Sequence, residues 1–418
     1  MHMHHQPPPP ERLAALRFAA LRFAALRFAA PRVPTFQLLI CLTWLALPGG
    51  CSDSICPDRP PDEFQLSPTG RAVAYVDREI FANGLNWMEA PTTDDPAISF
   101  DCLIDYFTAR FSNNVDIIFV VMNQSRGEFL EQSARKVIAN FTASQRFFES
   151  GIGSFRRPPI SNVGPPRLRS YSFLGVRDGL LAGPSLHEIA HGWSAYLDGP
   201  LSLAEQTDQD PISHWGFTSV GGVLGGWDAS SLEVLDDEQY RVCTASPHEA
   251  FAPQGYAHNS VPYAPLELYL MGLLDPDDVP DIQVAIDPVL TTVEGTCVTF
   301  QATELETVSV AEIIAANGVR LPSRQDSPKH FDVALIVIAQ RSLTDAEWQV
   351  YEDAMICMEA TSDCGNLATG IAHDGREVVF QPLTFFEATG GRASLRFAVL
   401  ETITEEDQAV TTHNNFTR

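Results

Sequence analysis

Two apolar runs have the composition and length of buried β-strands. Residues 115–123 read VDIIFVVMN and residues 330–340 read HFDVALIVIAQ, and both runs are rich in β-branched residues between polar flanks. Such uninterrupted runs are typical of strands that are covered on both faces. Residues 167–176, RLRSYSFLGV, instead alternate between polar and apolar side chains. That alternation predicts a strand with one face exposed to solvent.

A helix is predicted shortly after this alternating strand. Residues 183–199 read GPSLHEIAHGWSAYLDG, in which Ser185 can cap the start of a helix and Asp198 with Gly199 can end it. Apolar side chains spaced along the segment would hold the helix rigidly against a core. The sequence therefore predicts a strand, a turn and a helix in direct succession.

Further helices and strands are predicted toward the C-terminus. Residues 263–278, YAPLELYLMGLLDPDD, indicate a helix that Gly272 and the following prolines close, and residues 342–360 indicate an amphipathic helix. Residues 213–228 are rich in glycine and predict turns and short strands, and residues 375–400 supply two or more strands. Helices and strands mix without regular βαβ alternation, which favours an α+β fold.

The first fifty residues do not belong to this predicted fold. A repeated tract, LAALRFAALRFAALRFAA, is followed by the apolar run TFQLLICLTWLALPGG, which arginines precede and which small residues end at Cys51. Basic residues, a short apolar stretch and small residues, in that order, are typical of a secretory signal peptide. A cysteine at this position also resembles the lipidated cysteine of bacterial lipoproteins. We therefore expect an exported protein, either secreted or held in the bacterial outer envelope by a lipid on Cys51.

Charge and cysteine content narrow the function classes. The 53 acidic side chains outnumber the 27 basic ones and give a formal net charge of −26. Such a surface repels phosphate groups, so we expect no nucleic acid partner. Of the eight cysteines, Cys41 lies in the predicted signal and Cys51 is the lipidation candidate, which leaves six. In an oxidising compartment six cysteines predict up to three disulfides, and the short spacing of Cys357 and Cys364 favours that pair.

The segment LHEIAHGW carries the pattern His-Glu-x-x-His, formed by His187, Glu188 and His191. Residues four apart lie on one face of a helix, so both histidines can present a ring nitrogen to one metal ion about 2.0–2.1 Å away. Glu188 would point beside the metal, where a general base for a zinc-bound water belongs. The pattern predicts a zinc site in which Glu188 activates that water to attack a carbonyl group.

A catalytic zinc ion needs a third protein ligand and one open position. His214, in SHWGF, lies in the glycine-rich stretch, and Glu267, in PLELYLMGL, lies on a predicted helix. We expect His214 to be the third ligand, with Glu267 either taking that place or orienting a ligand from behind. Tyr263 and Tyr269 are candidate stabilisers of an oxyanion, with packing in the core as the alternative.

The motif segment resembles the zincin metallopeptidases, in which the H-E-x-x-H helix follows an edge strand and lines the floor of the cleft. Metzincins carry a third histidine six residues after the second, where this chain has Leu197. Gluzincins take a glutamate from a downstream helix, an arrangement that Glu267 would repeat at a longer separation. The combination HEIAHGW, SHWGF and LELYLMGL is similar to a group of uncharacterised exported bacterial proteins with predicted zincin catalytic regions. This resemblance covers roughly residues 100–400.

The resemblance implies an α+β, zincin-like catalytic region, in which a mixed sheet carries the active-site helix. We divide the chain into a signal and low-complexity region (1–50), a tether (51–70), a catalytic domain (71–285) and a C-terminal α/β subdomain (286–418). The predicted function is that of an extracytoplasmic zinc metallopeptidase acting on protein or peptide substrates. Two alternatives stay open: an exported binding or structural protein on a zincin scaffold without turnover, and a zinc hydrolase of a non-peptide substrate.

Overall fold

A computed structural model of the chain describes residues 55–57, 59–89, 96–133, 138–144, 163–194, 197–199, 201, 214–236, 238–246, 248–249, 251, 255, 258–371 and 377–403. These residues all belong to one compact unit, Asp53–Arg418. The predicted signal peptide and the lipidation candidate Cys51 lie outside the described residues. Within the described residues, no helix is both long and apolar enough to cross a membrane.

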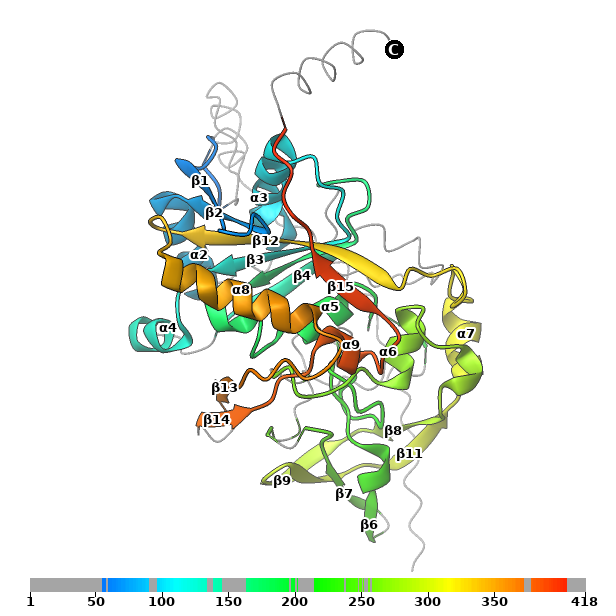
Figure 1. Ribbon diagram of the computed structural model, residues 1–418. Coiled ribbons are helices and arrows are strands. Elements are labelled where there is room, and N and C mark those ends of the chain that lie inside the picture. The colour runs from blue at the N-terminus through cyan, green and yellow to red at the C-terminus, as the bar shows by residue number, and fades with distance from the viewer. Residues whose placement is uncertain are drawn as a thin grey trace, which may run out of the picture. The chain divides into compact units, whose positions relative to one another are not determined.

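A mixed seven-stranded sheet forms the centre of the molecule (Figure 1). Its strand order is β1-β2-β12-β3-β5-β4, and β15 pairs with the beginning of β12. The four central strands run parallel, whereas β1 and β4 pair antiparallel at the two edges. The strands are β1 (Glu63–Leu66), β2 (Ala72–Val76), β3 (Ile117–Met122), β4 (Asn140–Ser144), β5 (Ser170–Leu174), β12 (His330–Ala339) and β15 (Ser394–Phe397). The mixture of this sheet with helices confirms the predicted α+β class.

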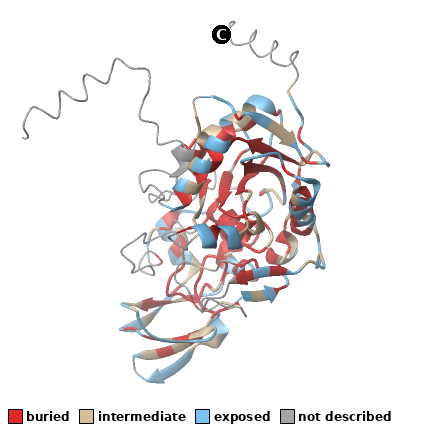
Figure 2. Cartoon of the chain, turned by 90° about the vertical axis from the view of Figure 1, so that its left-hand side faces the viewer, coloured by how far each residue is buried: buried red, intermediate tan, exposed pale blue. Residues whose placement is uncertain are grey.

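Alternate side chains of the central strands enter two separate cores. In β3, Ile117, Phe119 and Val121 belong to one core, and the intervening apolar residues belong to the other. Because helices cover both faces, β3 is buried along its whole length and β12 along most of its length (Figure 2). The prediction of two core strands is thus confirmed. The helices are α2 (Arg78–Glu89), α3 (Pro96–Arg110), α4 (Arg126–Gln132), α5 (Ser185–His191), α6 (Pro265–Leu270), α7 (Val310–Asn317), α8 (Asp345–Glu359) and α9 (Phe385–Ala388).

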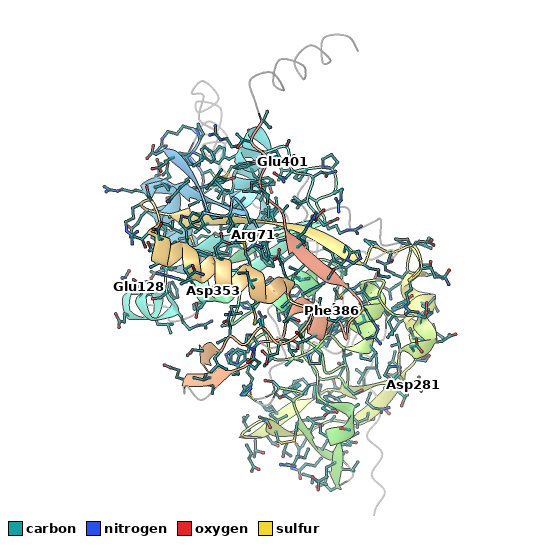
Figure 3. The ribbon with its side chains drawn as sticks, in the orientation of Figure 1. Arg71, Glu128, Asp281, Asp353, Phe386 and Glu401 are labelled. Carbon is teal, nitrogen blue, oxygen red and sulfur yellow. A yellow bond between two sulfur atoms is a disulfide. The ribbon has the colours of Figure 1, made fainter. Side chains whose placement is uncertain are left out.

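The predicted helix over residues 342–360 corresponds to α8. The Thr344 side chain accepts a hydrogen bond from the backbone N–H of Glu347, whose carboxylate in turn accepts the N–H of Thr344. Arg71, labelled in Figure 3, joins this helix to the start of β2 through Glu352 at 3.0 Å and Glu359 at 2.8 Å. Local capping therefore defines where α8 begins, and ion pairs hold it against the sheet.

The prediction of a half-exposed strand over residues 167–176 is wrong. All five residues of β5 are buried. Tyr171 and Phe173 enter the core on the α2 and α3 side, whereas the small polar residues Ser170 and Ser172 lie on the face toward α5. The polar positions therefore face a buried helix rather than solvent. Periodicity alone cannot distinguish these two environments.

The predicted boundary between residues 285 and 286 does not separate two cores. β12 belongs to the predicted C-terminal subdomain, yet it lies between β2 and β3 of the predicted catalytic domain. Part of the predicted tether also belongs to the fold, since β1 pairs with β2 and Cys56 is bonded to Cys102. Parallel strands can be neighbours across hundreds of residues, which a local pattern does not reveal.

The described residues also form three smaller sheets. A four-stranded antiparallel sheet, with the order β6-β7-β10-β9, lies in the lower part of Figure 1 and is exposed along both edge strands. Its core includes Phe217 and Trp227, so it is built on the segment that follows His214. The strands of the smaller sheets are β6 (Glu233–Asp236), β7 (Gln239–Cys243), β9 (Val289–Glu294) and β10 (Cys297–Gln301); β8 (Ile282–Ile286) with β11 (Glu304–Val308); and β13 (Ala368–Ile371) with β14 (Glu377–Phe380).

Three disulfides connect the six cysteines that remain when Cys41 and Cys51 are set aside. The pair predicted from its short spacing, Cys357–Cys364, is confirmed, and the other bonds are Cys56–Cys102 and Cys243–Cys297. Disulfides persist in oxidising compartments and are rare in the cytosol. The cysteine pairing therefore fits an extracellular location.

Removing the Cys56–Cys102 bond is expected to destabilise the protein more than removing the Cys357–Cys364 bond. The first bond spans 46 residues of sequence and the second spans 7. Loop-closure entropy in the unfolded chain predicts a loss of about 4 kcal/mol for the first and about 2 kcal/mol for the second. Urea unfolding of the two paired-serine variants beside the wild-type protein measures this order, and a larger loss for the short loop would contradict it.

Candidate metal site

The motif helix is shorter than predicted and is capped from a distant part of the chain. α5 spans Ser185–His191 and ends at Gly192, not at residues 198–199. Ser185 is the first helical residue rather than the cap, because Pro184 occupies the cap position and provides no side-chain hydrogen bond. Instead, Oδ1 of Asn259 accepts the N–H of Leu186 at 3.1 Å. A residue 73 positions away in the chain thus accepts one of the N–H groups that have no partner within the first turn of α5.

Three imidazole rings converge at this helix. Nε2 of His187 lies 3.0 Å from Nε2 of His191 and 3.2 Å from Nε2 of His214. The potential ligand atoms of the three residues all lie within 4.8 Å of one another. A zinc ion with tetrahedral bonds of about 2.05 Å would hold two nitrogens about 3.3 Å apart. The spacing therefore suits a single small metal ion.

The protonation of these rings also suits metal binding. Nδ1 of His187 lies 3.0 Å from the carbonyl oxygen of Val223, and with a proton on Nδ1 the nitrogen that carries a lone pair for metal binding is Nε2. Burial lowers the pKa of His191 well below its usual value, and repulsion from the other two rings lowers it further. Burial and repulsion from His187 likewise lower the pKa of His214. The neutral form of an imidazole is the form that binds metal, so both pKa shifts favour metal binding.

Glu188 occupies a buried position next to the first histidine. Its side chain is 4% exposed, and its Oε2 accepts a hydrogen bond from the hydroxyl of Thr142 at 2.8 Å. Burial raises the pKa of the carboxyl group to about 8, although the hydrogen bond from Thr142 acts in the opposite direction. The three imidazoles form the cluster of potential ligands, and Glu188, the next residue after His187 in the chain, is not one of its members.

Glu267 lies on α6 and does not join the cluster. Its side chain is completely buried, and its two oxygens accept hydrogen bonds from Nε1 of Trp215 and from backbone N–H groups of Val223, Leu224 and Ala264. Burial raises the pKa of this carboxyl group, and the four donors oppose that rise. Hydrogen bonds thus occupy both oxygens of Glu267. They anchor the loop that carries Trp215, the neighbour of His214, and Val223, whose carbonyl oxygen contacts His187.

Two glycines make this arrangement possible. A Cβ atom on Gly222 would overlap with the carboxylate of Glu267. A Cβ atom on Gly255, whose φ of +84° also disfavours other residues, would lie 2.8 Å from a carbon of the His187 ring. Gly222 lies in the segment 213–228, which is predicted to be rich in glycine and turns. Glycine is needed there for the close approach of Glu267 as well as for turns.

A Glu267→Gln variant is expected to weaken metal binding about 10–100-fold without removing a ligand. Glutamine has one carbonyl oxygen, so its NH₂ group would face two of the buried donors and leave them unsatisfied. Each such loss costs about 1–3 kcal/mol of unfolding free energy. Zinc titration and urea unfolding of this variant test the expectation, with the exposed Glu306→Gln as the matched control. Unchanged zinc affinity and stability would contradict the anchoring role.

Both candidate oxyanion tyrosines have structural partners. The hydroxyl of Tyr263 donates to the carbonyl of Leu186 at 2.9 Å, and that of Tyr269 accepts the N–H of Arg320 at 3.3 Å. Both side chains belong to the main core. The alternative of core packing therefore describes these residues, and neither is assigned a part in the reaction.

The supporting residues of the site had no signal in the sequence. Thr142 lies on β4, a short strand of the sequence NFTAS that hydrophobic patterning does not identify. Asn259 and the carbonyl of Val223 act through contacts that link segments far apart in the chain.

Comparison of the chain with known protein families, with curated proteins and with solved structures found no match.

Proposed function

We propose that the protein is a zinc-dependent metallopeptidase of the zincin type that acts outside the cytoplasm. The convergence of the three imidazoles of His187, His191 and His214 on the helix that also carries the buried Glu188 carries this proposal. Three histidine ligands with a fourth position left for water or substrate are typical of catalytic zinc, whereas structural zinc sites have four protein ligands.

The order of the elements around α5 also supports the zincin resemblance. The antiparallel edge strand β4, its neighbour β5 and then α5 follow one another along the chain. The resemblance implies an H-E-x-x-H helix that follows an edge strand. Here the strand directly before the helix lies one position inside the edge, and Thr142 of the edge strand itself contacts Glu188.

A zinc ion held by the three imidazoles would acidify a water molecule and polarise the carbonyl group of a substrate. In its deprotonated form, Glu188 takes one proton from the attacking water, whose oxygen bonds to the carbonyl carbon of the peptide bond. Glu188 then returns this proton to the amide nitrogen as the carbon–nitrogen bond breaks. The carboxyl group thus ends each cycle in the form in which it began.

Cleavage of labelled casein by the purified protein tests the proposed reaction, with Glu188→Gln as the control. New peptide amino termini that appear in the wild-type digest and are absent from the control digest would support it. Hydrolysis confined to ester substrates would instead identify a non-peptide hydrolase. Bound zinc with no hydrolysis of either substrate would identify a binding protein on the same scaffold.

A further inference from the structure

Thr142 and Ser172 form a pair of buried hydroxyl groups on the sheet face toward α5. Thr142 lies on β4 and Ser172 on β5, and the two residues are direct partners in the antiparallel register. Their hydroxyl oxygens are 2.9 Å apart, and the residues are 4% and 0% exposed. Their strand neighbours Phe141 and Phe173 pack into the core on the opposite face. The pair is thus a buried polar contact in the interface between the sheet and α5.

This hydroxyl pair contacts the predicted base. Oγ1 of Thr142 lies 2.8 Å from Oε2 of Glu188 and 2.8 Å from the main-chain oxygen of the same residue. The single hydrogen of the Thr142 hydroxyl group lies within reach of both the carboxyl oxygen and the main-chain oxygen of Glu188, and the same hydroxyl group can accept a hydrogen bond from Ser172. Within the described part of the chain, Oε1 of Glu188 makes no hydrogen bond. One carboxyl oxygen is therefore held, and the other is available for reaction.

We propose that Thr142 is a positioning residue that fixes the orientation of the Glu188 carboxyl group. This inference rests on the proposed function of Glu188 as the base. With Oε2 held by the hydroxyl group of Thr142, Oε1 is the carboxyl oxygen that would face the attacking water. A carboxyl group held at one oxygen loses less rotational freedom when the reaction begins, so the hydroxyl contributes to turnover rather than to metal binding.

Two substitutions at this position separate positioning from packing. Thr142→Val keeps the size and β-branching of the side chain but removes the hydroxyl group, whereas Thr142→Ser keeps the hydroxyl group and removes a methyl group. We expect Thr142→Val to lower kcat for peptide cleavage about 10–100-fold with little change in KM or bound zinc. Thr142→Ser should retain most of the wild-type kcat. A packing role predicts the reverse order, and either that order or equal losses would overturn the proposal.

A second readout does not depend on turnover. Urea unfolding midpoints are measured for zinc-loaded wild-type protein, Thr142→Val, Glu188→Leu and the double variant. We expect the double variant to shift the midpoint by less than the sum of the single shifts, because both changes remove the same hydrogen bond. If the shifts are additive and the protein cleaves peptides, the positioning role of Thr142 is wrong and the proposed function stands. Coupled shifts in a protein that hydrolyses nothing would support the contact and contradict the proposed function.

Discussion

A His214→Ala variant is expected to be isolated with little or no bound zinc and to lose hydrolytic activity. Nε2 of His214 lies 3.2 Å from Nε2 of His187, so its removal leaves a site with two protein ligands. The loss of activity should exceed the roughly 10–100-fold effect that is typical of residues behind the ligands. Elemental analysis of zinc and a peptide cleavage assay measure the two effects.

The exposed His330 offers a matched control for this variant. His330→Ala removes an imidazole from the start of β12 and is expected to retain both zinc and activity. The opposite assignment makes a distinct prediction: if Glu267 were the third ligand, Glu267→Gln would empty the site and His214→Ala would leave it filled. That pair of results would contradict the arrangement of His187, His191 and His214.

A Glu188→Gln variant is expected to keep its zinc and to lose turnover by about 10²–10⁴-fold. Glutamine has nearly the same shape as glutamate, and its carbonyl oxygen can still accept the hydrogen bond from Thr142. It cannot take a proton from water at neutral pH, so the change removes the base and leaves the metal ligands intact. Zinc content and kcat are measured on the same preparation. Near-normal kcat with full zinc would place the base at another residue.

The sequence was sufficient to predict the ligand cluster because its main signal is local. His187 and His191 are four residues apart, and any helix at this position brings their rings to one face. The sequence predicts His214 as the third member because a glycine-rich segment can bend back toward the helix, and the structure places its ring in the cluster. Cys357 and Cys364 were likewise paired correctly because few residues separate them.

Contacts between distant segments could not be predicted in this way. The Asn259 side chain caps α5, and the position of β12 between β2 and β3 depends on pairing across hundreds of residues. Ser172 shows the same limit in a different form. Its polar character indicated exposure to solvent, whereas it lies buried next to Thr142 under the helix. A polar side chain in a strand needs a hydrogen-bond partner, and that partner can be a protein group as well as water.

The role of Glu267 also depended on information that is absent from a single sequence. An acidic residue on a helix downstream of an H-E-x-x-H motif fits a metal ligand and an anchor equally well. The structure distinguishes them because four hydrogen-bond donors surround the carboxylate. A ligand oxygen would need a free lone pair directed at the metal, and this environment directs both oxygens at the loop 215–224 and the start of α6.

The most direct test of the central claim is to measure zinc and casein cleavage together, before and after treatment with a chelator. We expect close to one zinc ion per chain, cleavage that disappears when the chelator removes this zinc, and recovery of cleavage when zinc is restored. Cleavage that persists in the zinc-free protein would contradict the claim that His187, His191 and His214 form the metal site of a peptidase.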